Sequence, residues 1–186
     1  MFGFSVKIFR FVGIDVKIDV GWGLIAAFIA WSLARGVFPQ LYAGFSTGAY
    51  WQMAATAVVG LAISVILHEL AHSLVAKGLG LPIKSITLFI FGGVAELEEE
   101  PKSPFAEFLM AVAGPLMSVA LAIGFGWMTT RPDIRTGFPV LSSTFDYLSL
   151  VNWTLAAFNM LPAFPLDGGR VFRAVVWGIK RDIGAA

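Results

Sequence analysis

The chain has 186 residues, of which 58% are hydrophobic and 13% are charged, and its formal net charge is +1. Soluble domains carry about 25% charged residues, so this composition predicts a membrane protein, and the length allows one domain over residues 1–186. The near-neutral charge excludes a basic surface for nucleic acid, and the absence of cysteine excludes disulfides, thiolate metal sites and a cysteine nucleophile.

The first twenty residues are predicted to form a β-hairpin at the membrane surface. Apolar and charged side chains alternate between residues 4 and 20, and a period of two is typical of a strand. Gly13 can turn this segment back on itself. Lys7, Arg10 and Lys17 punctuate it, and no small-residue cleavage site follows an early apolar core, so a signal peptide is not expected.

Four apolar segments then predict a bundle of about four transmembrane helices. They cover residues 20–34, 36–67, 108–130 and 147–166. The first is short for a span, since about 20 residues are needed, and the second is expected to continue as a helix to about Lys77. An amphiphilic segment from Arg170 predicts a partial fifth helix. The predicted fold class is therefore an all-α membrane protein with short strands at its cytoplasmic surface.

An insertion of strand and loop is predicted between the second and third helices, at residues 83–101. Ile86, Leu88 and Ile90 alternate with other side chains, which favours a strand. Gly92 and Gly93 are expected to end this strand. The glutamate run at residues 98–100 is expected to be a solvated loop.

The distribution of lysine and arginine predicts the orientation in the cell membrane. If the amino terminus is cytoplasmic, ten of the 13 basic residues lie on that side and three, Arg35, Arg131 and Arg135, lie on the other. Cytoplasmic loops carry an excess of such residues. The carboxyl end of the second helix and the segment after the fourth are thus expected near the cytoplasmic face.

The segment His68-Glu69-Leu70-Ala71-His72 is the motif HExxH, and it contains both histidines of the chain. Positions i and i+4 share one face of a helix, so both imidazoles can reach one metal ion, and Glu69 can act on a metal-bound water as general base. The alternative is a polar cluster satisfied between helices. Ionisable groups within membrane helices are costly and are functional by default, which favours the metal site.

A catalytic zinc takes three protein ligands, so a carboxylate has to complete the site. The candidates near the cytoplasmic ends of the apolar segments are Asp167 and Glu96. Asp167 precedes two glycines at a break in the chain, where irregular backbone can line a cavity. The simpler interpretation of "LDGG" is a turn, but the need of HExxH for a partner favours Asp167.

Two further features have both structural and functional interpretations. Asn159 can contact substrate or a developing oxyanion, or can form a hydrogen bond between helices. Pro162 and Pro165 are expected to interrupt the helix after it. The segment "AGP" at residues 113–115 is most simply explained by close helix packing with a kink.

Three stretches together resemble the site-2 protease family of intramembrane zinc metalloproteases. They are "HELAHSLVA" at 68–76, "FGGVAELEEEPKSPFAEFLMAVAGPLMS" at 91–118 and "NMLPAFPLDGGRVFRA" at 159–174. The resemblance implies one Zn²⁺ per chain held by His68, His72 and Asp167, with Glu69 as the catalytic glutamate. It also implies a substrate or transition-state contact at Asn159 and a substrate-presenting strand near Gly92 and Gly93.

The hairpin and the absence of an inserted PDZ-like domain resemble the branch whose members often carry C-terminal CBS domains. This chain ends at Ala186 without a CBS region, as expected of a catalytic-core fragment or a minimal member. The expected function is hydrolysis of a peptide bond within or beside the membrane segment of a single-pass substrate, in regulated intramembrane proteolysis. The alternatives are another membrane zinc hydrolase and an inactive metal-binding scaffold.

Overall fold

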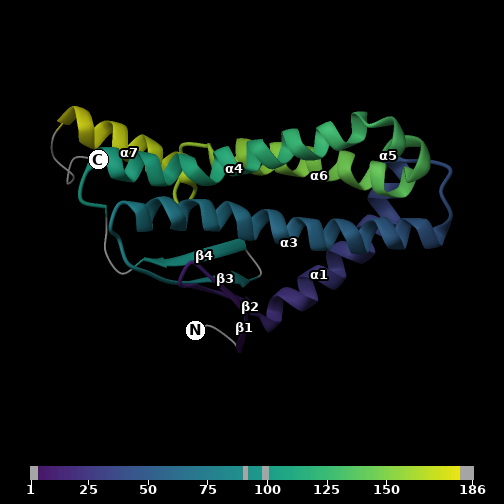
Figure 1. The fold of residues 1–186 in the computed structure, drawn as a ribbon, viewed down its shortest axis with the longest axis horizontal. Helices are drawn as coiled ribbons and strands as arrows, with labels where there is room; N and C mark the ends of the chain where they lie inside the picture. Colours follow the sequence, from purple (N-terminus) through teal and green to yellow (C-terminus); the bar gives the residue numbers. More distant parts are fainter. Residues whose placement is uncertain (1–3, 90–91, 98–100, 181–186) are drawn as a thin grey trace.

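The computed structural model describes residues 4–89, 92–97 and 101–180, and long helices with one small sheet dominate it (Figure 1). The helical elements are α1 Val20–Ser32, the π-helical turn η1 Leu33–Val37, α2 Phe38–Leu41, α3 Thr47–Gly78, α4 Pro104–Thr130, α5 Pro132–Gly137, α6 Pro139–Asn159 and α7 Asp167–Lys180. The strands are β1 Ser5–Phe11, β2 Ile14–Asp19, β3 Ile83–Phe89 and β4 Gly92–Leu97. The predicted fold class, an all-α membrane protein with short strands, is confirmed, while the cytoplasmic location of the strands stays a prediction.

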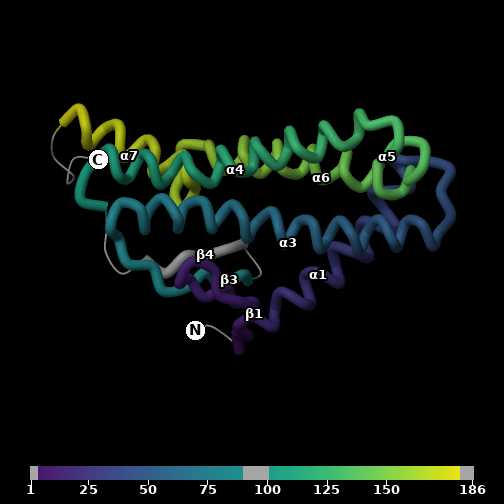
Figure 2. Tube along the Cα trace, in the orientation of Figure 1, coloured from purple at the N-terminus to yellow at the C-terminus, as the bar shows by residue number. Residues whose placement is uncertain are grey.

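Helix α3 is the central element. It lies between the sheet on one side and the layer of α4, α6 and α7 on the other, as the chain trace also shows (Figures 1 and 2). Its 32 residues extend about 48 Å at 1.5 Å per residue, well beyond the ~30 Å hydrocarbon core of a bilayer. The second predicted helix is thus present, and it ends one residue after Lys77.

Within the described residues, three helical stretches are long and apolar enough to cross a membrane: Val20–Leu41, Thr47–Gly78 and Pro104–Thr130. Large apolar side chains on them are exposed, among them Leu24 (77%), Leu116 (63%) and Ile123 (58%), as expected of a surface that faces lipid. The fourth predicted span falls on α6 and the turn after it. The first half of α6 contains several serines, a threonine and Asp146, so its crossing of the membrane stays a prediction.

The first span is longer than the apolar segment 20–34. Helix α1 continues without a break through η1 and α2, which makes a stretch of 22 residues. Arg35 does not interrupt it, because the Arg35 side chain is exposed while Leu33 and Ala34 beside it are buried. A long basic side chain near a helix end can extend toward water while the helix continues in lipid.

The four strands form one sheet in the order β1-β2-β3-β4. The antiparallel pair β1 and β2 is the expected hairpin, and its turn has positive φ at Val12 (47°) and Gly13 (83°). Strands β2 and β3 are parallel, with Val16 opposite Ile86, because the chain passes through α1 and α3 between them. The position of this sheet at the membrane surface stays a prediction.

The predicted insertion at residues 83–101 contains the antiparallel pair β3 and β4. Gly92 lies opposite Phe89 and Gly93 opposite Leu88, so the two glycines begin a strand and do not end one. Strand β4 is at the edge of the sheet. Ile90 and the expected glutamate loop at 98–100 lie outside the described residues.

The sheet is attached to the turn of α3 that carries the HExxH motif. Ile14 of β2 and Ile86 of β3 are fully buried, and both belong to one apolar cluster with Leu70, the central residue of the motif. The sheet therefore supports α3 from the side opposite to α4.

Candidate metal centre and family

The two histidines of HExxH lie one turn apart on the buried face of α3. His68 is 4% exposed and His72 is 7% exposed, and their Nε2 atoms are 3.1 Å apart. This is the geometry that the i, i+4 spacing predicts for a helix. Glu69 is half-buried, close enough to the charges of His72 and Asp167 to interact with both.

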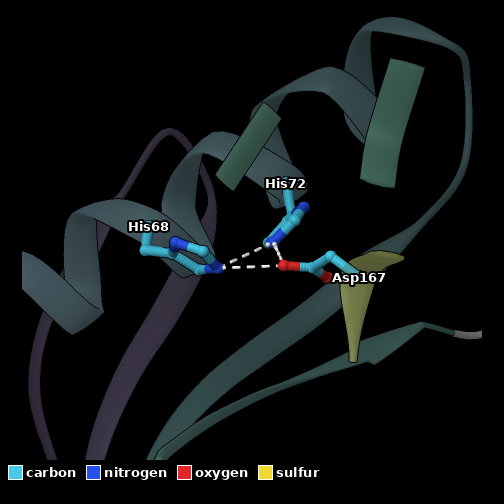
Figure 3. Close-up of side chains that lie close together, drawn as sticks. All are labelled: His68, His72 and Asp167. Carbon is cyan, nitrogen blue, oxygen red and sulfur yellow. Dashed lines mark hydrogen bonds and ion pairs between the residues drawn. The ribbon is translucent and has the colours of Figure 1, made fainter. Parts of the chain in front are cut away.

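The third side chain of the candidate metal centre comes from near the carboxyl end of the chain. Asp167 is the first residue of α7, and its Oδ2 atom lies 3.2 Å from Nε2 of His68 and 3.2 Å from Nε2 of His72 (Figure 3). The three side chains form the one group of histidines and carboxylates in the described part of the chain that could hold a metal ion. Glu96, the other predicted candidate, lies on β4, and its side chain is outside the described structure.

The donor set and spacing fit a tetrahedral zinc ion. Ligand atoms about 2.0–2.1 Å from such an ion are about 3.3 Å from one another, close to the 3.1–3.2 Å that separates these three atoms. Gly114 of α4 leaves the space beside the histidine Nε2 atoms free. A Cβ atom on Gly114 would lie 2.1 Å from Nε2 of His72 and 2.6 Å from Nε2 of His68. Only glycine leaves the region between the two Nε2 atoms open on this side.

The outer nitrogens of both rings are engaged by α4. Nδ1 of His72 lies 2.6 Å from the carbonyl oxygen of Met110, and Nδ1 of His68 lies 2.9 Å from Oγ of Ser118. A histidine that donates from Nδ1 has its Nε2 lone pair available for a metal. Both rings therefore direct Nε2 toward Asp167.

Asp167 is in the form that binds metal. Burial alone would raise the pKa of the Asp167 carboxyl, but hydrogen bonds to His68 and His72 outweigh burial and lower that pKa to about 2. The carboxylate is consequently ionised at neutral pH, as a metal ligand has to be.

The turn before α7 determines where Asp167 lies. Helix α6 ends at Asn159, and residues 160–166, which contain both prolines, turn back onto the start of α7. A Cβ atom on Gly168 would lie 2.3 Å from the carbonyl oxygen of Met160, and one on Gly169 would lie 2.7 Å from that of Ala163. The two glycines are therefore needed for close approach of two backbones. Neither glycine has a positive φ, so an unusual backbone conformation is not the reason for glycine at these positions.

A buried ion pair attaches α7 to α4. Glu107 is fully buried in the first turn of α4, and its Oε1 accepts a hydrogen bond of 2.7 Å from Nε of Arg173 and another from Nη2. The Arg173 guanidinium also lies 6.0 Å from the ring centroid of Phe164, in the turn before α7. These contacts fix α7, the helix that begins with Asp167, against α4 and against the turn before it.

The remaining predicted site residues are not part of this cluster. Asn159 is the last residue of α6, and its Nδ2 donates a hydrogen bond of 2.9 Å to the carbonyl oxygen of Leu155 in the same helix. This bond is neither of the two contacts considered from the sequence. Gly92 and Gly93 lie at the start of the edge strand β4, on the other side of α3.

Sequence reasoning missed the contribution of α4. Met110, Gly114 and Ser118 recur every four residues, so they lie in one stripe of that helix. The "AGP" segment was expected to serve only helix packing, yet its glycine lies against both imidazoles. The four-residue spacing is a signal in the sequence, but it has meaning only once α4 is known to pack on α3.

Comparison with known proteins agrees with this arrangement. The model of peptidase family M50 matches residues 56–132 and 134–186. Rip3 of Mycobacterium tuberculosis is 38% identical over 188 residues, 98% of this chain and 47% of Rip3. The zinc metalloprotease MJ0392 of Methanocaldococcus jannaschii is 34% identical over 175 residues, 93% of this chain and 46% of that protein.

The chain also resembles a solved structure, the site-2 protease from Methanocaldococcus jannaschii. The TM-score is 0.60 and the identity 32%, covering 94% of this chain and 73% of that one. The chain spans about half the length of the curated relatives it matches. The matched residues include the HExxH helix, α4 and the start of α7, and the chain belongs to peptidase family M50, the family of the site-2 proteases.

Proposed function

We propose that residues 1–186 form the single catalytic domain of an intramembrane zinc metalloprotease, which hydrolyses a peptide bond within or next to a transmembrane segment of a membrane protein. One observation carries the proposal: His68, His72 and Asp167 direct three ligand atoms at one point, and Glu69 adjoins them on a helix able to cross a membrane. Two histidines and one carboxylate with an open fourth position are typical of catalytic zinc.

The roles of the residues follow from their positions. His68, His72 and Asp167 would hold the ion, which when bound supplies Lewis acidity to a carbonyl oxygen and lowers the pKa of water. Glu69 accepts the proton of the attacking water and delivers it to the leaving amine, as a general base and then a general acid. The half-buried position of Glu69 beside His68 suits both transfers.

The substrate is proposed to be a single-pass membrane protein in the lipid bilayer. A peptide bond inside a helix is shielded, so the substrate has to become extended before it is cut. The edge strand β4, which begins at Gly92 and Gly93, offers backbone groups with which an extended segment can pair as an added strand. Asn159 adjoins the turn that leads to Asp167 and is proposed to contact the substrate or the developing oxyanion.

The membrane orientation is proposed from the basic residues. The sheet, the carboxyl end of α3 and α7 would lie at the cytoplasmic side of the cell membrane, with the amino terminus. Cleavage there would release the cytoplasmic part of a substrate, which is the output of regulated intramembrane proteolysis.

The experiment that tests the proposal compares Glu69→Gln with the unchanged protein on a panel of single-pass substrates. We expect one bound zinc per chain in both and an internal cut in the membrane segment only with Glu69 present. Asp133→Asn, which neutralises an exposed carboxylate on α5, is the control and should cut normally.

Each alternative has its own outcome. Cleavage by Glu69→Gln at the normal rate would exclude Glu69 as the base. Release of a terminal peptide instead of an internal cut would identify another membrane zinc hydrolase. Zinc binding without cleavage of any substrate in the panel would favour an inactive scaffold.

A further inference from the structure

The two histidines of the candidate metal centre have different partners on α4. Nδ1 of His72 faces the carbonyl oxygen of Met110 at 2.6 Å, and Nδ1 of His68 faces the hydroxyl of Ser118 at 2.9 Å. Ser118 is fully buried, and Met110 of the same stripe is 1% exposed. Water cannot easily replace either partner.

The two partners do not restrict their histidines equally. A carbonyl oxygen only accepts hydrogen bonds, so Met110 requires that Nδ1 of His72 carry the proton. That tautomer leaves Nε2 of His72 free for a metal. The partner of His72 belongs to the backbone, so side-chain substitutions do not remove it. A hydroxyl both accepts and donates, and the partner of His68 is a side chain that substitution can remove.

We propose that Ser118 is a positioning residue, which accepts the Nδ1–H of His68 and so holds the His68 ring with Nε2 directed at the zinc ion. This inference rests on the zinc centre proposed above. Ser118 itself touches neither the ion nor the substrate, and it acts through the orientation and tautomer of His68. Neighbours that orient a ligating histidine typically contribute 10-fold to 100-fold to metal affinity.

The substitution Ser118→Ala should therefore weaken zinc binding by about 10-fold to 100-fold, because a buried Nδ1–H then lacks an acceptor when His68 binds the metal. Ser118→Thr keeps the hydroxyl and should restore most of the affinity. Ser73→Ala is the matched control: Ser73 is also fully buried and adjoins His72 in sequence, but its hydroxyl has no hydrogen-bond partner in the described structure.

The experiment measures zinc affinity by competition with a chelator for the chain of residues 1–186 and its three variants in detergent. Nitrogen NMR with labelled histidine gives a second readout, and it is simple because the chain contains two histidines. In the zinc-loaded protein we expect protonated Nδ1 and metal-bound Nε2 in both residues. This spectrum needs no variant, so it tests the inference even where Ser118→Ala fails to fold.

Three results would separate the possibilities. If the unchanged chain binds no zinc, the proposed metal centre is wrong. If it binds one zinc and Ser118→Ala binds equally well, or if zinc occupies Nδ1 of His68, the positioning role is wrong while the metal centre stands. If Ser73→Ala weakens binding as much as Ser118→Ala, the effect reflects packing and the inference is overturned.

Discussion

Gly114 offers the sharpest test of the metal centre, because a single methyl group there would occupy the space next to the ligand atoms. Alanine at this position would place Cβ 2.1 Å from Nε2 of His72 and 2.6 Å from Nε2 of His68. Ordinary non-bonded contacts between heavy atoms are about 3.5 Å, so the His72 ring would have to move by more than about 1 Å. Gly114→Ala should therefore weaken zinc binding strongly without unfolding the bundle.

The magnitude follows from the partners that the rings would lose. A shift of that size breaks the 2.6 Å contact of His72 with Met110 and strains the 2.9 Å contact of His68 with Ser118. Each buried N–H left without an acceptor costs about 1–3 kcal/mol, or about 2–6 kcal/mol for both. At 1.4 kcal/mol for each tenfold change, zinc affinity should fall by at least about 30-fold.

The assay is zinc affinity by chelator competition, with thermal unfolding as a check on the fold. Gly124→Ala is the control, since Gly124 lies in the same helix and a Cβ there meets nothing within 4 Å. Both substitutions should raise helix propensity by about 1 kcal/mol. Unchanged zinc affinity in a folded Gly114→Ala protein would refute the reasoning, because the ion and the methyl group would then occupy different places.

Two more predictions concern stability. Substitution of Arg173 by Met should destabilise the protein by about 3–5 kcal/mol, because the fully buried Glu107 carboxylate loses its partner. Substitution of Glu107 by Gln should cost less, because the Arg173 side chain is 24% exposed and can reach water. The double variant Glu107→Gln with Arg173→Met should recover part of that loss in thermal unfolding, and strict additivity would contradict a direct pair. Removal of zinc by a chelator should lower the melting temperature, because the metal would link α3 to α7, and free zinc at 1,000 times Kd contributes about 4 kcal/mol. If the chelator did not change the melting temperature, no metal would link α3 to α7.

Local patterns in the sequence predicted the elements that depend on neighbouring residues. The alternation in residues 4–20 predicted the hairpin, and the apolar runs predicted the helices that became α3 and α4. The i, i+4 spacing placed His68 and His72 on one face before any tertiary contact was known. The first apolar segment, 20–34, was too short, because the exposed basic side chain of Arg35 does not end the helix, which continues to Leu41.

Tertiary structure decided the contacts between distant segments. Asp167 meets His68 across 99 residues of sequence, and Ser118 meets His68 across 50. The sequence offered two carboxylates, Asp167 and Glu96, and favoured Asp167, but it was the packing of α7 on α4 that brought the Asp167 carboxylate to the histidines. Spacing along the chain determines which side chains share a helix face. Only the packing of α4 and α7 against α3 determines which atoms complete a site between helices.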